Sequence, residues 1–191
     1  DMAGISRTAA KTINLGIFYG MGKNKLSKEL GISKDKAMQL LQQYDQRVPF
    51  VKKLATEVMN SAAKFGFIRT LKGRKCRFNM WEPNTWEMHK SMPYEEAKAH
   101  YGNNIRRSGT YKALNRLIQG SAADQSKVAM IECCKAGYMP LLQIHDELCF
   151  SINDEKDTTQ VKDIMENCIE GLKVPFKVDI ALGPSWGEAK E

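Results

Sequence analysis

Apolar residues recur every three or four positions through residues 33–65, and this spacing predicts a long helix. Ser33 is a suitable N-cap and Gly66 a suitable end. Pro49 lies inside the run and predicts a break or a kink there. The pattern therefore indicates two helical segments, one on each side of the proline.

Other segments show helix or strand signals of the same kind. We expect further helices at about residues 6–20, 108–136 and 157–171. Short apolar runs with turn residues between them predict hairpins at 67–78 and 139–152, and a strand at 176–181. Residues 79–103 contain Pro and Asn without sustained periodicity, so we expect an insertion or irregular connection. Long helices and short antiparallel strands together predict an α+β fold.

The 191 residues have an ordinary globular composition, which excludes disordered, collagen-like and low-complexity classes. No apolar run is long enough to span a membrane, and there is no secretory signal pattern. Charge is divided unevenly. Residues 1–145 carry 24 basic and 11 acidic side chains, whereas residues 146–191 carry 5 and 11. A basic body fits a polyanionic partner, although a solvated basic surface explains the charge equally well.

Five cysteines without CxxC spacing, in a chain with no secretory signal, predict reduced and mostly buried thiols. The three histidines lie at no zinc-ligand spacing, so a zinc site is not expected.

The first predicted helix carries two cations that can reach successive phosphates. Arg7 and Lys11 are one turn apart, and Leu15 and Phe18 continue the same face. Apolar and aromatic groups farther along would then meet a base or a sugar. No Walker A string is present, which excludes a P-loop as the phosphate cradle. The alternative is a core helix with solvated cations.

Two further sets fit nucleic acid. The hairpin at 67–78 carries five cations with no acid between them, which suits a phosphate backbone: Arg69, Lys72, Arg74, Lys75 and Arg77. Asn115 and Gln119 share one helix face, and their amides can bond the acceptors that every base pair presents in the minor groove. A solvated hairpin and exposed helix amides are the alternatives.

The string QIHDELCF places Asp146 and Glu147 at an expected hairpin tip between apolar strands. Adjacent carboxylates there suit a hard divalent cation shared with substrate phosphates. An ordinary acidic turn is the alternative.

Taken in order, these strings resemble family A DNA polymerases, the DNA polymerase I-like group. RTAAKTINLGIFYG resembles the fingers-helix motif, ALNRLIQGSAAD the palm helix that bears Asn and Gln, and QIHDELCF the HDE hairpin. The palm-helix string is more similar to phage-type members. The resemblance implies fingers over residues 1–78 and the C-terminal part of the palm, with its antiparallel sheet, over residues 104–191.

The resemblance also implies residue roles on the nucleotide side. Arg7 and Lys11 would bind the triphosphate, and Tyr19 and Gly20 would lie by the templating base and the fingers hinge. Leu15 takes a place that is usually aromatic in the family, beside the nucleotide sugar, which affects sugar discrimination.

On the DNA side, Asn115 and Gln119 would contact the minor groove of the primer–template. His145 would lie near the primer end. Asp146 would be one of two metal-binding aspartates, with Glu147 as an accessory. Two Mg²⁺ ions would then activate the primer 3′-hydroxyl and stabilise the pyrophosphate.

One departure from the family pattern shapes the expected function. The second catalytic aspartate lies in a DYSxIE-like string that precedes the fingers helix, and no such string occurs here. We expect this chain to perform template-directed DNA synthesis only with an N-terminal polymerase segment that carries that aspartate and the thumb. Its partners would be primer–template DNA and dNTP, in the cytoplasm of a bacterium or a phage-infected host cell. The alternative is a non-catalytic nucleic-acid-binding remnant of such a polymerase.

Overall fold

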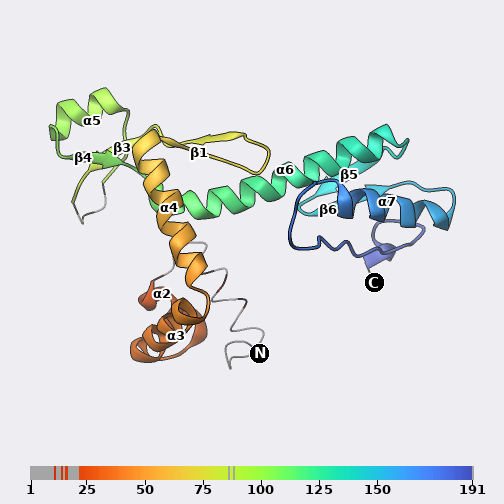
Figure 1. The fold of residues 1–191 in the computed structure, drawn as a ribbon, viewed down its shortest axis with the longest axis horizontal. Coiled ribbons are helices and arrows are strands. Elements are labelled where there is room, and N and C mark those ends of the chain that lie inside the picture. The colour runs from red at the N-terminus through yellow and green to blue at the C-terminus, as the bar shows by residue number, and fades with distance from the viewer. Residues whose placement is uncertain are drawn as a thin grey trace. The chain divides into compact units, whose positions relative to one another are not determined.

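The computed structural model describes Lys11, Asn14, Gly16, residues 22–85, Glu87 and residues 89–190. Internal contacts divide the chain into two compact units, Asp1–Gly120 and Ser121–Glu191. Each unit is described by itself below. Short antiparallel strand pairs and longer helices alternate along the chain (Figure 1), which is the predicted α+β class.

Two helices open the described part of the first unit, α2 (Lys23–Leu30) and α3 (Lys34–Arg47). Ser33 caps α3 as predicted, because its hydroxyl accepts a hydrogen bond from the Lys36 amide at 3.2 Å. Leu26 and Ala37 form the buried centre of this pair. The sequence patterns did not predict α2, whose eight residues are too few to show a full apolar stripe.

Pro49 ends one helix and begins the next, as predicted. Helix α4 runs over Pro49–Phe65 with the proline in its first turn, where a missing amide costs no intrahelical bond. Gly66 closes α4 in the left-handed region at φ +74°, which glycine adopts without steric cost. The predicted stop at Gly66 is therefore confirmed.

The predicted hairpin after α4 is present as β1 (Phe67–Arg69) paired antiparallel with β2 (Lys75–Arg77). Ile68 and Phe78 are nearly fully buried there against Ala62 and Ala113. Burying a side chain of that size contributes about 1.5–3 kcal/mol. This core holds the hairpin against α4 and the start of the following long helix.

Residues 79–103, expected as an insertion or irregular connection, contain regular elements in the structure. This stretch holds β3 (Trp81–Pro83) and α5 (Tyr94–Tyr101), and β3 pairs with β4 (Ile105–Arg107). The pairing joins positions more than twenty residues apart, so no local period reveals it.

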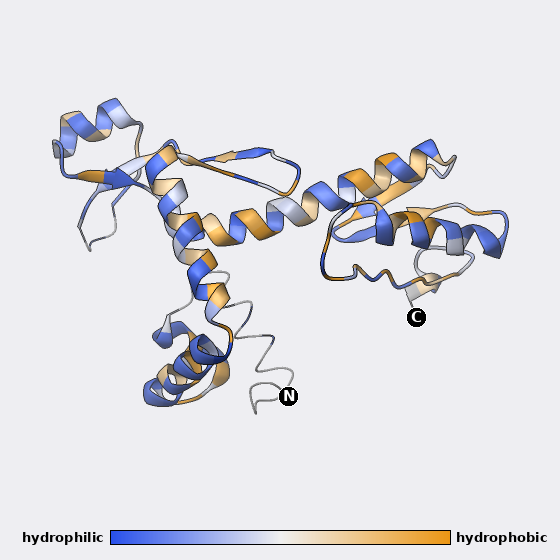
Figure 2. Cartoon of the chain, viewed as in Figure 1, coloured by the Kyte–Doolittle hydropathy of each residue, from blue (hydrophilic) through white to orange (hydrophobic). Residues whose placement is uncertain are grey.

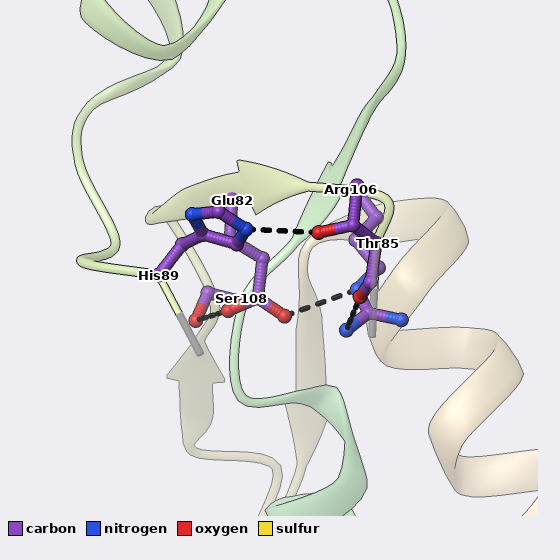
Figure 3. A network of polar contacts seen from close by, with 5 residues as sticks. All are labelled: Glu82, Thr85, His89, Arg106 and Ser108. Carbon is purple, nitrogen blue, oxygen red and sulfur yellow. Dashed lines mark hydrogen bonds and ion pairs between the residues drawn. The ribbon is translucent and has the colours of Figure 1, made fainter. Parts of the chain in front are cut away.

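A set of polar contacts joins β3 and β4 and the residues next to them (Figure 3). The Glu82 carboxylate accepts from Arg106 Nε at 3.0 Å and from the Ser108 hydroxyl at 2.6 Å. Thr85 and His89 are 2.9 Å apart, between the hydroxyl and Nε2. Because Glu82 is the shared acceptor for β4 and for the residue that follows it, it fixes the register of this strand pair.

The long predicted helix is α6 (Ala113–Lys135), and a 3₁₀ turn, η1 (Thr110–Lys112), precedes it. Gly137 follows at φ +93°, and the Tyr138 amide bonds the Cys133 carbonyl at 2.9 Å. These features form the predicted glycine C-cap. Residues 113–120 of α6 lie in the first unit and residues 121–135 in the second.

The second unit contains the hairpin β5 (Pro140–Ile144) and β6 (Glu147–Phe150), helix α7 (Glu155–Asn167) and a short 3₁₀ turn, η2 (Glu188–Lys190). Buried residues of α6 and α7 supply its core, namely Ala129, Cys133, Val161 and, just beyond α7, Ile169. The predicted strand at 176–181 was wrong as a strand, because this segment has no strand partner within the part of the chain that the structure describes. Its apolar and polar residues alternate all the same (Figure 2).

The five cysteines are free, but only Cys133 is buried, so the expectation that most would be buried was wrong. Among the described residues, no helix is both long enough and apolar enough to cross a membrane.

Candidate active site and nucleic-acid interface

A two-residue turn presents the acidic tip of the β5–β6 hairpin. Ile144 pairs with Glu147, so His145 and Asp146 form the turn and Glu147 is the first residue of β6. Of the two carboxylates expected at the hairpin tip, Asp146 lies in the turn and Glu147 lies beside it in the first strand pair. All three side chains from His145 to Glu147 are exposed. They are therefore accessible to a ligand.

Among the described residues, His145 is the one residue other than glycine with a left-handed backbone, at φ +54°. This conformation costs about 1–2 kcal/mol for a residue with a Cβ. A turn of two residues requires such a backbone, and in return it projects Asp146 beyond the ends of both strands.

We predict that His145→Gly raises the free energy of unfolding by about 0.5 kcal/mol. Glycine removes the left-handed cost but gains about 0.5–1 kcal/mol of unfolded-state entropy. Urea unfolding monitored by circular dichroism measures the difference. Asp146→Gly is the matched control in the same turn and is expected to lower stability by about 0.5–1 kcal/mol. Equal destabilisation by both changes would contradict strain at His145.

The hairpin tip forms one wall of a pocket of about 420 Å³ within the second unit. The other walls come from α6, from Met165 of α7 and from the extended segment that follows α7. Its polar lining side chains are Gln125, Ser126, Gln143, His145, Asp146, Glu147, Lys177 and Asp179. Three acidic residues and one lysine therefore belong to the lining of one space.

Gln125 is the unexpected member of this pocket. Its side-chain Nε2 is buried, and it has no hydrogen-bond partner among the residues that the structure describes. A buried amide donor without a partner costs about 1–3 kcal/mol. This donor is buried and is thus not itself open to the pocket, although Gln125 lines it.

Carboxylate oxygens are the donors that Mg²⁺ prefers, so Asp146 and Glu147 fit a divalent cation by chemistry. However, the described residues hold no group of three His, Cys, Asp or Glu side chains placed to enclose a metal ion. These two residues would therefore hold a cation together with oxygens from elsewhere, as Mg²⁺ sites shared with substrate phosphates do.

Glu166 on α7 fixes the segment that forms the far wall. Its carboxylate accepts from the Val178 amide at 2.9 Å and lies 3.5 Å from Lys177 Nζ and 4.0 Å from Lys162 Nζ. The Val178 hydrogen bond, assisted by the two lysines, lowers the pKa of Glu166 below its usual 4.5. The charged carboxylate is thus the form that holds the wall.

We predict that Glu166→Gln destabilises the chain at neutral pH and much less in acid. Because the folded-state pKa of Glu166 is lowered, its stabilisation is complete above about pH 4.5 and is lost as the pH falls through the folded-state pKa. Urea unfolding at a series of pH values from 7 to 3 measures the gap between the two proteins. Glu170→Gln, at an exposed carboxyl of the same unit, is the control. A gap that stays constant with pH would contradict the ionic role of Glu166.

The predicted DNA-binding cations lie on the β1–β2 hairpin of the first unit. Arg69 donates to the Gly73 carbonyl at 2.9 Å, and Arg74 donates to the Gly120 carbonyl of α6 at 2.9 Å. Lys75 and Arg77 are exposed on β2. Arg69 and Arg74 are therefore partly occupied within the fold, and the exposed Lys75 places its Nζ 4.7 Å from the centroid of the Phe67 ring.

Asn115 is half-buried and Gln119 is exposed, one turn apart on α6. Both belong to the first unit, as does Arg74. The pocket residues from His145 to Glu147 belong to the second unit.

Lys11 is helical and exposed, as a phosphate ligand requires, and Gly16 in the same segment is buried. The Tyr44 hydroxyl on α3 donates to Asn14 Oδ1 at 2.7 Å, which ties the Lys11 segment to α3. Burial, together with the neighbouring charge of Asp45, raises the pKa of Tyr44, so it remains a neutral donor at physiological pH. The remaining predicted ligands lie outside the described residues: Arg7, Leu15, Tyr19 and Gly20.

Sequence patterns missed Gln125, Glu166, Lys177 and Asp179. The alternation of residues 176–181 was the one available signal, because it places Lys177 and Asp179 on the same face of an extended segment.

The chain matches the family model for DNA polymerase family A over residues 1–188. It is 35% identical to a DNA-directed DNA polymerase of Pseudomonas phage M6, over 99% of this chain and 30% of the phage protein. It is 31% identical to the thermostable DNA polymerase I of Thermus aquaticus, over 98% of this chain and 21% of that protein.

Among solved structures, the chain is similar to the POL domain of Pol1 from M. smegmatis in complex with DNA primer-template and dNTP. The TM-score is 0.74 at 30% identity, over 97% of this chain and 31% of that one. The chain thus spans about a fifth to a third of the length of these relatives. On the extent of the family match and the level of identity, the chain belongs to DNA polymerase family A.

Proposed function

We propose that this chain takes part in template-directed DNA synthesis, in which a nucleotide passes from a dNTP to a primer 3′-hydroxyl. The exposed pair Asp146 and Glu147 carries the proposal, because the His145–Asp146 turn and the first residue of β6 place the two acidic residues side by side in the lining of a pocket of the second unit. Exposed adjacent carboxylates suit chemistry on phosphates through a divalent cation. The M. smegmatis relative was solved with primer-template and dNTP, which favours the same ligands here.

The nucleotide would lie on the first helix. Arg7 and Lys11 would bind its triphosphate, where charge-assisted contacts to phosphate oxygens are strong. Leu15 would lie beside the sugar, and Tyr19 and Gly20 beside the templating base. The exposure of Lys11 and the tie from Tyr44 to Asn14 support a cation held ready on a fixed helix.

The primer–template would lie against the first half of α6 and the basic hairpin. Gln119, and the half-buried Asn115 one turn before it, can donate to base acceptors in the minor groove without reading sequence. Exposed cations of β2 would contact phosphates. His145 would lie near the primer end.

Asp146 and Glu147 would hold Mg²⁺ on this chain's side of the site. The ion supplies positive charge that lowers the cost of deprotonating the primer hydroxyl and of releasing pyrophosphate. Lys11 and Arg7 would offset the remaining charge on the triphosphate. Oxygens beyond those of this hairpin are needed to complete the coordination shell, since Mg²⁺ requires six ligands.

An upstream polymerase segment would supply the missing aspartate. Residues 174–182 support this proposal, because they alternate like a strand and yet expose their apolar side chains, with Val174 75% and Leu182 51% accessible. An added strand would bury these side chains and complete the backbone hydrogen bonds.

Primer extension tests the proposal with this chain alone and with the part of the Pseudomonas phage M6 polymerase outside the matched region. We expect no extension by either piece and extension by the mixture, in the presence of Mg²⁺ and dNTPs. Processive synthesis by this chain alone would contradict the need for an upstream segment. Primer–template binding that dNTP and Mg²⁺ do not tighten, with no extension in the mixture, would favour a non-catalytic binding remnant.

A further inference from the structure

Gly120 lies in the interior of α6, where glycine costs about 1 kcal/mol relative to alanine. The surroundings explain its presence. A Cβ built on Gly120 would lie 2.7 Å from Cγ2 of Thr70, which is closer than real Cβ atoms approach another carbon. Glycine therefore allows the loop of the β1–β2 hairpin to touch the helix backbone at this position.

The loop that reaches Gly120 is itself closed by hydrogen bonds. The Thr70 amide donates to the Arg74 carbonyl at 3.0 Å, and the Arg74 amide donates to the Thr70 hydroxyl at 3.1 Å. Thr70 is only 7% exposed although it is polar. Gly73 provides the left-handed backbone of the turn at φ +79°. The loop thus presents Thr70 and Arg74 to α6 as one rigid edge.

Arg74 completes the contact from the side of the loop. Its Nη2 donates to the Gly120 carbonyl at 2.9 Å, so the guanidinium uses a donor on the backbone of α6. A carbonyl has two lone pairs, which allows this bond in addition to the helical one. The sequence assigned Arg74 to DNA, whereas this geometry gives it a structural bond.

A second arginine also joins the β1–β2 hairpin to α6, but here the donor lies on the helix and the acceptor on the hairpin. Arg116 on α6 donates to the Arg77 carbonyl of β2 at 3.3 Å and stacks on the Phe78 ring, 4.7 Å from its centroid. Arg116 and Gly120 are four residues apart and share one face of α6. Figure 1 shows the hairpin beside this part of the helix. Two contacts one turn apart fix the rotation of α6 about its own axis.

We infer that Arg74 is a positioning residue, and that it forms with Thr70 and Gly120 a joint that aims Gln119 at DNA. Gln119 precedes Gly120 and lies about 100° around the helix from it, so the rotation set at Gly120 decides the direction of the Gln119 amide. The inference rests on the proposed contact of Gln119 with the minor groove. It assigns Arg74 to the joint in place of a phosphate.

A rescue experiment tests the joint. Gly120→Ala places a methyl group against Thr70 Cγ2, and Thr70→Ser removes that carbon while keeping the hydroxyl that bonds Arg74. We measure primer–template affinity with and without Gln119→Ala in each background. Gln119→Ala is expected to weaken binding about threefold to tenfold in the unsubstituted chain, as for loss of one hydrogen bond. In the G120A background, Gln119→Ala is expected to weaken binding less than about twofold. In the G120A/T70S background, the full threefold to tenfold loss of affinity is expected to return.

Salt dependence distinguishes the two roles of Arg74. In the Arg74→Gln background, Gln119→Ala is expected to have no further effect on primer–template affinity. The slope of log affinity against log salt concentration is expected to stay unchanged. Lys75→Gln is the matched control on the exposed face of β2, and it is expected to reduce that slope by about 0.9 and to keep the Gln119 cost. Circular dichroism melting confirms that each variant is folded.

The outcomes separate the joint from the proposed function. Arg74→Gln could instead reduce the slope of log affinity against log salt concentration by about 0.9, the value for one phosphate contact, while Gln119→Ala still weakens binding in that background. Arg74 would then be a phosphate ligand, and the inference fails. A full Gln119 cost in G120A also overturns it, as does no cost in the unsubstituted chain. If neither the unsubstituted chain nor its mixture with the phage M6 segment binds primer–template, the proposed function fails and the inference fails with it.

Discussion

Asp146→Ala is expected to reduce primer extension by about three orders of magnitude or more in the complemented enzyme, that is, the mixture of this chain with the phage M6 polymerase segment. The change removes a carboxylate from the pocket lining, and with it the ligand that we propose for a catalytic cation on this chain. Single-turnover extension with saturating dNTP measures the chemical step. We expect primer–template affinity without dNTP to change little, because an acidic side chain contributes nothing to phosphate binding.

Asp179→Ala is the matched control, since Asp179 lines the same pocket from the opposite wall. The family resemblance assigns no metal to it, so we expect less than about a tenfold loss. Comparable losses from Asp146→Ala and Asp179→Ala would indicate that the reacting metal is held across the pocket and not at the hairpin tip.

Lys11→Ala is expected to lower kcat/KM for dNTP by about 10²–10³ in the same complemented assay. Lys11 is exposed on its helix, and its ammonium would neutralise charge that grows on the triphosphate during transfer. Lys11→Arg keeps the charge and is expected to recover part of the loss. The affinity for primer–template alone is expected to change little.

Lys25→Ala on α2 is the control, because it removes an exposed cation from the same unit without touching the first helix. A loss as large as that of Lys11→Ala would mean that the net charge of this unit, and not a specific phosphate contact, governs nucleotide use. An unchanged kcat/KM in Lys11→Ala would contradict the nucleotide role of this helix.

Local signals predicted the elements whose ends are set by single residues. Ser33 caps α3 with its own hydroxyl, Pro49 divides two helices, and Gly66 and Gly137 end helices with positive φ. Each of these effects acts within one helical turn, so the sequence contains the information in full.

Pairings between distant positions were not predictable in this way. The strands β3 and β4 pair through positions such as Trp81 and Arg107, on either side of α5 in the sequence. Residues 176–181 alternate like a strand but have no strand partner among the described residues. A strand exists only when a partner supplies its hydrogen bonds, and an alternating pattern does not show whether one is present.

The candidate site likewise contains residues that local patterns predicted and residues that they did not. The string HDE predicted exposed carboxylates at a turn, and the order of motifs indicated the family, which the match over residues 1–188 confirms. Gln125, Glu166 and Asp179 entered the site only when α6, α7 and the extended segment were brought around one pocket.

By itself the sequence determined the chemistry that this chain can offer: the cations of the first helix, the amides of α6 and the carboxylates of the hairpin. Tertiary structure alone decided how those groups are used. It turned Arg74 toward the carbonyl of Gly120, placed Glu147 in a strand and buried a Gln125 donor for which the described residues offer no acceptor. The reason is physical. The type of a side chain fixes which bonds it can make, whereas packing between distant segments fixes which partner lies within reach.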